Sequence, residues 1–330
     1  MAHTLTNVTS LSNLLAAWRE FESGKRNKPD VQYFARNLFD NLLSLQQDVR
    51  LGQYQHGPYE RFVVSDPKTR IIHKASVRDR VLHRAIYRLL YPFFDKTFIS
   101  DSYSCRKDKG THKALNRFIV LARKVGHNHN RTVWVLKADI RKFFASIDQD
   151  VLINNLKDYV SDDALMQLLR TVIRSFKTEK SRGLPLGNLT SQLFCNIYMN
   201  SFDQYVKHKL RVPHYIRYAD DFALISHDRD WLMDQIEPMQ KYLRKELKLE
   251  MHPDKLWIKT FASGVDFLGW VHFPHHRVLR SSTRKRAQRA MSTANDQALQ
   301  SYLGLLQHGN TRKLHEDLRN SYWFEQKHNY

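Results

Sequence analysis

Residues 214–226 read HYIRYADDFALIS, two apolar runs on either side of the adjacent aspartates Asp220 and Asp221. This pattern predicts two strands joined by a tight turn that carries both carboxylates. Taken alone, an Asp-Asp pair more often marks a solvated turn, because aspartate favours turns. The alternative is a cation site, since two carboxylates at the tip of an apolar hairpin repel each other unless a cation lies between them.

A third carboxylate lies upstream, in residues 132–148, TVWVLKADIRKFFASID. An apolar strand over residues 133–136 is expected to deliver Asp139 at its end. Phosphoryl transfer requires neutralisation of the attacking, leaving and non-bridging oxygens, and a pair of Mg²⁺ ions supplies it. Because Mg²⁺ prefers oxygen ligands, aspartates on rigid strand ends suit such a site.

The order of elements around the aspartates predicts an α+β fold: strand, two helices, two strands, helix, strand, arranged as a split βαβ sheet with helices on one face. Upstream, residues 11–28 and 31–52 predict a pair of amphipathic helices, and residues 59–72 a hairpin. Residues 76–98 and 231–249 each predict one amphipathic helix, and the basic stretch from residue 281 onwards predicts further helices.

Composition points to a polyanionic partner. The 330 residues carry a formal net charge of +20, which favours nucleic acid through counterion release, with a generally basic surface as the plainer alternative. No run of about 18 apolar residues suggests a membrane span, and the N-terminus lacks a secretory pattern, so a cytoplasmic protein without a membrane partner is expected. Two cysteines exclude a disulfide framework and a four-cysteine zinc site.

Seven segments in register resemble the motifs of the reverse transcriptase family, here in a compact prokaryotic form similar to group II intron enzymes. The resemblance implies a right-hand polymerase with fingers (residues 1–133, including part of the palm), a ferredoxin-like palm (134–278) and a short helical thumb (279–330). The segments are VSDPKTRIIHKASVRDRVLHRAI, DSYSCRKDKGTHKAL, KADIRKFFASID, LPLGNLTSQLFCNIY, YIRYADDFALIS, LKLEMHPDK and VDFLGW.

The resemblance also implies a catalytic apparatus for RNA-directed DNA synthesis. Asp139 and Asp220 would bridge two Mg²⁺ ions, for which Mn²⁺ can substitute, and Asp221 would help to hold the ion that activates the primer 3′-hydroxyl. The Ile140 carbonyl would complete the shell of the nucleotide metal. Lys255 would protonate the leaving pyrophosphate.

The substrates implied are dNTPs, a template RNA and the RNA/DNA hybrid. Lys68 and Arg70 match the hairpin cations that hold phosphates, although they could be ordinary surface charges. Phe144 matches the aromatic residue that leaves no room for a 2′-hydroxyl, so the product should be DNA. The remaining matches are Lys142, Phe143, Leu186, Gly187 and Gln192 for the incoming nucleotide, and Phe267, Leu268 and Gly269 for the primer grip.

One loop departs from the common family pattern, which has Gln-Gly and then Ser-Pro where this chain has Leu186-Gly187 and Ser191-Gln192. Loss of the amide at position 186 leaves an apolar wall, which should weaken checking of the base pair unless the change is neutral. This form resembles error-prone reverse transcriptases of diversity-generating retroelements. They copy a structured template RNA with errors at adenines and work with a small basic helical accessory protein.

Two other roles stay open. An antiphage-defence or retron-like reverse transcriptase would copy its own noncoding RNA, although Leu186 and Gln192 count against a retron. A non-catalytic RNA-binding protein is the alternative of another class. Retention of the three aspartates argues against it.

Overall fold

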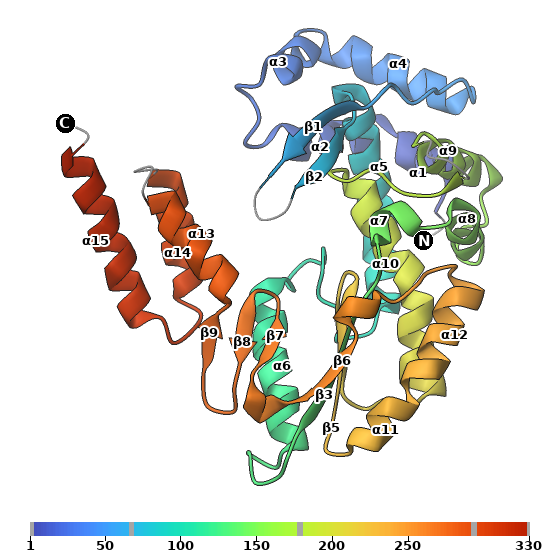
Figure 1. Ribbon diagram of the computed structural model, residues 1–330. Coiled ribbons are helices and arrows are strands. Elements are labelled where there is room, and N and C mark those ends of the chain that lie inside the picture. The colour runs from blue at the N-terminus through green and yellow to red at the C-terminus, as the bar shows by residue number, and fades with distance from the viewer. Residues whose placement is uncertain (1–2, 66–68, 177–180, 292–295, 329–330) are drawn as a thin grey trace. The chain divides into compact units, whose positions relative to one another are not determined.

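The computed structural model describes residues 3–65, 69–176, 181–291 and 296–328 (Figure 1). Contacts divide the chain into two compact units. The first unit comprises residues 1–106, 140–211 and 237–252, and the second comprises residues 107–139, 212–236 and 253–330. The division into consecutive fingers, palm and thumb segments stays a prediction.

The second unit is built on a four-stranded sheet of β3 (Trp134–Asp139), β4 (Tyr215–Tyr218), β5 (Asp221–Ser226) and β6 (Trp257–Thr260). The strand order is β4-β5-β3-β6, and all neighbours are antiparallel. Helical segments connect β3 to β4 and β5 to β6, whereas β4 and β5 form a hairpin. This is the predicted split βαβ, ferredoxin-like arrangement.

The centre of this sheet is buried on both faces. Four consecutive residues of β5, from Phe222 to Ile225, are 0% exposed, and consecutive strand side chains point to opposite faces. The helix α6 (Thr111–Val125) contacts β4 and β5, and α11 (Arg229–Asp234) contacts β3, β5 and β6. The prediction of one covered face therefore needs correction, because a sheet covered on one side only would alternate buried and exposed residues.

A second, three-stranded sheet follows in the same unit, formed by β7 (Val265–Phe267), β8 (Trp270–His272) and β9 (Arg277–Leu279). Phe118 of α6 packs against Phe267 at 4.8 Å between ring centroids, so α6 is anchored on this sheet. The chain continues with α13 (Ser281–Met291), α14 (Asp296–Leu306) and α15 (Arg312–His328), which contact one another. The helical C-terminal region is thus confirmed.

The first unit is mostly helical. Its long helix α5 (Val77–Thr97) packs against α2 (Leu11–Glu22) and α10 (Leu189–Gln204), and it is continuous as predicted although Pro92 lies within it. The predicted hairpin is present as β1 (Glu60–Val64) and β2 (Arg70–Lys74). The other elements are α1 (Leu5–Thr9), α3 (Pro29–Arg36), α4 (Leu38–Arg50), α7 (Phe143–Ser146), α8 (Gln149–Lys157), α9 (Asp163–Arg174), α12 (Ile236–Glu246) and the π-helix η2 (Tyr205–Lys209).

Two expected helices are interrupted. Residues 31–52 form α3 and α4 instead of one helix, because Asn37 adopts φ −121° and ψ 46° between them. Residues 231–249 form α11 and α12, and Pro238 lies in the first turn of α12, where its missing N–H is tolerated. Among the described residues, no helix is long and apolar enough to cross a membrane.

Candidate active site

The three predicted aspartates converge at one end of the four-stranded sheet in the second unit. Asp139 ends β3 and lies directly across from Asp221, the first residue of β5, in the antiparallel register. Asp220 precedes it in the two-residue turn after Tyr218, which pairs with Asp221. Strand register therefore brings together carboxylates that lie about eighty residues apart in the chain, as 221 − 139 = 82.

A buried arginine fixes the turn that presents Asp220. Ala219 adopts a left-handed φ of +56°, which costs a non-glycine residue free energy. The side chain of Arg217 is fully buried, and its Nη1 donates to the Ala219 carbonyl at 2.9 Å. Arg217 thus supports the backbone of the turn that carries Asp220.

Two lysines pair with the carboxylates. Lys137 Nζ lies 3.0 Å from Asp221 Oδ2, and Lys255 Nζ lies 2.7 Å from Asp139 Oδ1. Lys137 is two residues before Asp139 on β3, so both side chains point to the same face of the sheet. Lys255 belongs to the 3₁₀ turn η3 (Pro253–Lys255) just before β6. Lys255 therefore lies beside Asp139, and its role in protonating pyrophosphate stays a prediction.

Asp221 has an unfavourable environment for an ionised carboxylate. Burial, together with the negative charges of Asp139 and Asp220, raises the pKa of Asp221 to about 6, although Lys137 acts in the opposite direction. Its Oδ1 is buried and has no hydrogen-bond partner among the described residues. An oxygen of this kind suits a cation, and the carboxylate donor set suits Mg²⁺.

The described part of the chain contains no group of three or more His, Cys, Asp or Glu side chains that already meets metal-ligand geometry. The ion pairs give a physical reason, because Lys137 and Lys255 each hold one carboxylate oxygen. A metal would have to compete with these ammonium groups. The residue types fit Mg²⁺, but the two-metal arrangement remains a proposal.

Lys137 and Arg217 are not among the site residues predicted from the sequence. Both are charged residues inside apolar strands, and a single charge in a strand is ordinarily taken as a solvent-facing position. The available signal was spacing: Lys137 lies at i−2 from Asp139, and Arg217 lies at i+2 from Tyr215 within a strand that turns at the aspartates. Their positions next to the carboxylates become evident only from strand pairing.

The predicted primer grip forms the turn between β7 and β8. Phe267 is fully buried, whereas Leu268 and Gly269 both adopt left-handed φ values, +51° and +85°. The Gly269 carbonyl accepts a hydrogen bond from the Arg280 backbone N–H at 3.1 Å. The turn is thus tied to the start of the C-terminal helices, and its role in holding a primer stays a prediction.

The predicted nucleotide loop lies in the first unit, on β2. The Leu186 carbonyl accepts from the His73 N–H at 2.9 Å, and the Asn188 amide donates to the His73 carbonyl at 2.8 Å. Gly187 has φ +101°, and a Cβ there would lie 2.7 Å from Ile72 Cγ2. A side chain at Gly187 would therefore separate the loop from β2, the strand that carries Arg70. The Arg70 side chain is exposed, and Lys68 lies outside the described residues.

The other predicted nucleotide-site residues differ from one another in exposure. Ile140 is buried and pairs with Met251 in an isolated bridge, Phe143 is 3% exposed, Phe144 is half-buried, and Gln192 is exposed. Phe143 is thus a core residue whose side chain is not free to meet a nucleotide. Lys142 adopts φ +47° and lines a basic hollow of about 500 Å³, together with Arg141, Ser146, Arg182, Arg244, Lys248, Leu249 and Glu250.

Comparisons with known proteins identify the family. Residues 65–272 match the family described as reverse transcriptase (RNA-dependent DNA polymerase). The chain is 27% identical over 292 residues to protein YkfC of Escherichia coli K12, with 76% of this chain and 74% of YkfC covered. It is 21% identical to the group II intron-encoded protein LtrA of Lactococcus lactis, covering 79% of this chain and 57% of LtrA.

Among solved structures, telomerase from Candida albicans in complex with a fragment of telomeric RNA aligns with a TM-score of 0.51 at 12% identity. The alignment covers 81% of this chain and 56% of the telomerase chain, and it supports the fold alone. The family match spans both motifs that carry the aspartates and ends at β8. The chain belongs to the reverse transcriptase family of RNA-dependent DNA polymerases.

Proposed function

We propose that the chain makes cDNA on a structured RNA template by two-metal nucleotidyl transfer at Asp139, Asp220 and Asp221. The observation that carries this proposal is the pairing of Asp139 with Asp221 across β3 and β5, with one buried Asp221 oxygen that has no hydrogen-bond partner in the described part of the chain. A purely structural acid would be satisfied by donors from its own chain.

In this proposal Asp139, Asp220 and Asp221 would hold the Mg²⁺ ions. Bound Mg²⁺ would lower the pKa of the primer 3′-hydroxyl and neutralise the charge that develops on the phosphate oxygens. Lys137 would keep Asp221 oriented. Lys255, at 2.7 Å from Asp139, would donate a proton to the leaving pyrophosphate oxygen.

The nucleotide contacts are proposed from the resemblance of the motifs. Lys68, Arg70 and Lys142 would hold the triphosphate, and Phe144 would exclude ribonucleotides by occupying the space of a 2′-hydroxyl. The basic side chains of Lys142 and the other lining residues favour an anionic ligand at that hollow. The Ile140 carbonyl would serve the nucleotide metal as a neutral oxygen ligand.

We also propose that copying is error-prone and that the chain serves a diversity-generating retroelement. Leu186 is half-buried, and its backbone carbonyl accepts a hydrogen bond from the His73 N–H. Because its side chain is a hydrocarbon, it can form no hydrogen bond to a base pair. A template RNA and a small basic helical protein are the expected partners. A defence-associated enzyme that copies its own noncoding RNA would share the chemistry but not the error pattern.

Primer extension tests the catalytic proposal. The wild-type protein with Mg²⁺, dNTPs, a primer and an RNA template should incorporate dNTPs, whereas it should incorporate rNTPs poorly. Absence of incorporation by the wild type, with its cognate RNA and partners present, would favour the RNA-binding alternative. Sequencing of the cDNA tests the narrower role: errors concentrated at template adenines support the retroelement, and equal error rates at all four bases contradict it.

A further inference from the structure

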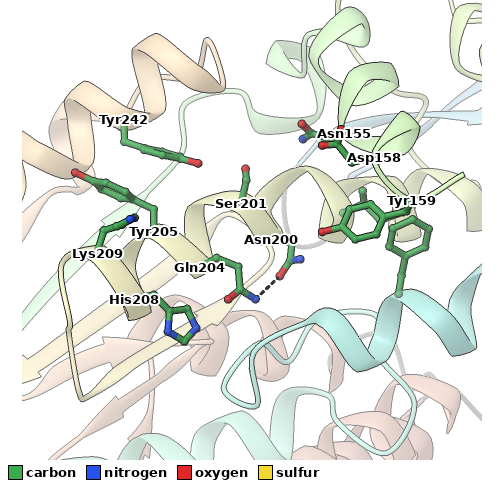
Figure 2. A pocket seen from close by; sticks show the side chains of 12 residues that line it. Asn155, Asp158, Tyr159, Asn200, Ser201, Gln204, Tyr205, His208, Lys209 and Tyr242 are labelled. Atoms are coloured by element: carbon green, nitrogen blue, oxygen red, sulfur yellow. Dashed lines mark hydrogen bonds between the residues drawn. The ribbon is translucent and has the colours of Figure 1, made fainter.

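A cavity of about 430 Å³ lies in the first unit, between α10 with its π-helical extension η2 and the helices α5, α8 and α12 (Figure 2). All of its lining residues belong to the first unit, so it is not formed by the aspartates of the second. Its volume is in the range of pockets that hold a small organic ligand. The two ends of the cavity differ in chemistry, and this difference indicates the ligand.

One end presents a hydrogen-bond donor beside an acceptor. Asn155 and Asp158 come from the last turn of α8 and the residue after it, and Figure 2 shows their side chains next to each other. Asn155 Nδ2 is buried and has no hydrogen-bond partner within the described residues. The Asp158 carboxylate forms no ion pair with any described residue. A nucleobase edge carries donors and acceptors side by side and is complementary to this pair.

The opposite end is cationic. His208 and Lys209 lie on η2, and both side chains are exposed at the rim of the cavity. A π-helical turn is rare and is frequently found at functional sites. Here its wider turn, closed by the Leu210 N–H on the Tyr205 carbonyl at 3.0 Å, places Tyr205, His208 and Lys209 around one opening. Histidine and lysine at an opening suit a phosphate group.

Aromatic rings and amides connect the two ends. Tyr159 is 42% exposed and meets Phe94 edge to face at 5.3 Å, and Tyr205 stacks on Tyr242 at 4.1 Å. Gln204 lies between these ends; its Nε2 donates to the Thr97 carbonyl at 2.9 Å, which leaves its oxygen available as an acceptor. Tyrosine faces with nearby amides are the usual means of holding an unpaired base.

We propose that this cavity binds a single unpaired nucleotide of RNA, with its base at Asn155 and Asp158 and its phosphate at His208 and Lys209. A ligand with a base-like edge at one end and an anion at the other can pair with Asn155 and the Asp158 carboxylate at the first end and with His208 and Lys209 at the second. The proposal rests on the proposed function only in that RNA is the partner. It adds a second RNA contact that does not require the aspartates.

Binding measurements with matched charge variants test this proposal. Lys209→Glu and Asn155→Leu should each weaken binding of a fluorescent single-stranded RNA by roughly tenfold. Their affinity for the fully paired RNA/DNA hybrid of the same sequence should stay at the wild-type value. Lys245→Glu is the control, because Lys245 is exposed on α12, has Glu246 at 3.9 Å and does not line the cavity. Melting temperatures check that all variants fold.

Equal weakening by Lys209→Glu and Lys245→Glu would overturn the proposal, because it would show a general effect of charge. Ultraviolet crosslinking followed by mass spectrometry gives a second readout, with crosslinks expected at Tyr159 or Tyr205. Crosslinks confined to other peptides would also overturn it. The two proposals fail separately: Asp221→Asn should lose primer extension and keep these crosslinks.

Discussion

Two aspartates, the buried Asp79 of the first unit and the half-buried Asp221 of the second, show how the same residue type can have different surroundings. Asp79 lies in the first turn of α5 and is 1% exposed. Its carboxylate accepts from the Tyr54 hydroxyl at 2.7 Å, the Gly57 N–H at 3.1 Å and the Ser76 hydroxyl at 2.6 Å. Both of its oxygens are satisfied, and a negative charge at a helix N-terminus is favourable.

Asp221 is the opposite case. Among the described residues its ion-pair partner is Lys137, two carboxylates lie nearby, and one of its oxygens is buried without a donor. The difference indicates that Asp79 organises the fold, whereas Asp221 is held in a costly environment that a bound cation would relieve. The predictions below separate these two roles.

The largest expected effect is loss of catalysis on substitution of Asp221. Asp221→Asn should reduce Mg²⁺-dependent dNTP incorporation by at least about 10³-fold. The substitution removes a proposed ligand of the metal, and the bound metal would stabilise the charge of the transition state by several kcal/mol. The melting temperature should stay the same or rise, since an unfavourable buried charge disappears. A clear drop in melting temperature would mean that Asp221 is a structural acid like Asp79.

Substitution of Asp79 is expected to have the opposite effect, a loss of stability with little change in incorporation. Asp79→Asn should lower the free energy of unfolding by about 3 kcal/mol, because an amide disrupts hydrogen bonds that a buried charge accepts. Chemical denaturation measures this change. Incorporation per folded molecule should stay near the wild-type value, and a loss comparable with that of Asp221→Asn would contradict the contrast.

The pH dependence of incorporation should follow the Asp221 carboxyl. Because the pKa of Asp221 is raised to about 6, the folded chain holds a proton there below that pH, and a proton competes with Mg²⁺. At subsaturating Mg²⁺ the rate should therefore fall by up to about tenfold per pH unit below pH 6. Lys137→Met should move this fall to higher pH, since the Lys137 ammonium lowers the Asp221 pKa; an unmoved profile would exclude Asp221 as the titrating group.

The loss of folding stability at acid pH should depend on buried histidines rather than on Asp221. Burial lowers the pKa of His83 to about 3, so the unfolded chain, with its ordinary histidine pKa of 6.5, binds a proton that the folded chain does not. Stability contributed by neutral His83 is therefore present above pH 6.5 and is lost as pH falls towards 3. His272 is lowered to about 3 for the same reason, so denaturation curves should be compared for His83→Leu and His272→Leu, each of which should flatten part of the acid decline.

The smallest expected effect concerns fidelity. Leu186→Gln restores the amide that the common family pattern has, and it should reduce misincorporation at template adenines by a few-fold, because a hydrogen bond is worth about 1 kcal/mol. Sequencing of cDNA from one RNA template measures the error spectrum. Leu186→Met is the matched control, since it keeps an apolar side chain of similar volume. An unchanged spectrum for Leu186→Gln would indicate that Leu186 is a neutral variant.

Much of the catalytic sheet could be predicted from the sequence, because apolar runs of strand length lead directly to Asp139 and to the Asp220–Asp221 turn. The interruption at Asn37 could not, since amphipathic periodicity continues through it and only the backbone shows the break, whereas Pro238 is a sequence signal for the break at Gln235. Lys137 and Arg217 were missed for a related reason. Their importance depends on which strands pair, and pairing is a long-range property that local spacing does not contain.

A cation-binding measurement tests the central claim, that the unsatisfied oxygen of Asp221 is kept for a metal, most directly. Free Mn²⁺ can be followed by electron paramagnetic resonance during a titration of the wild type, Asp221→Asn and Asp79→Asn at pH 7.5. We predict that the wild type and folded Asp79→Asn bind Mn²⁺ with equal stoichiometry and that Asp221→Asn loses at least one site. Equal binding by Asp221→Asn and the wild type would contradict the account.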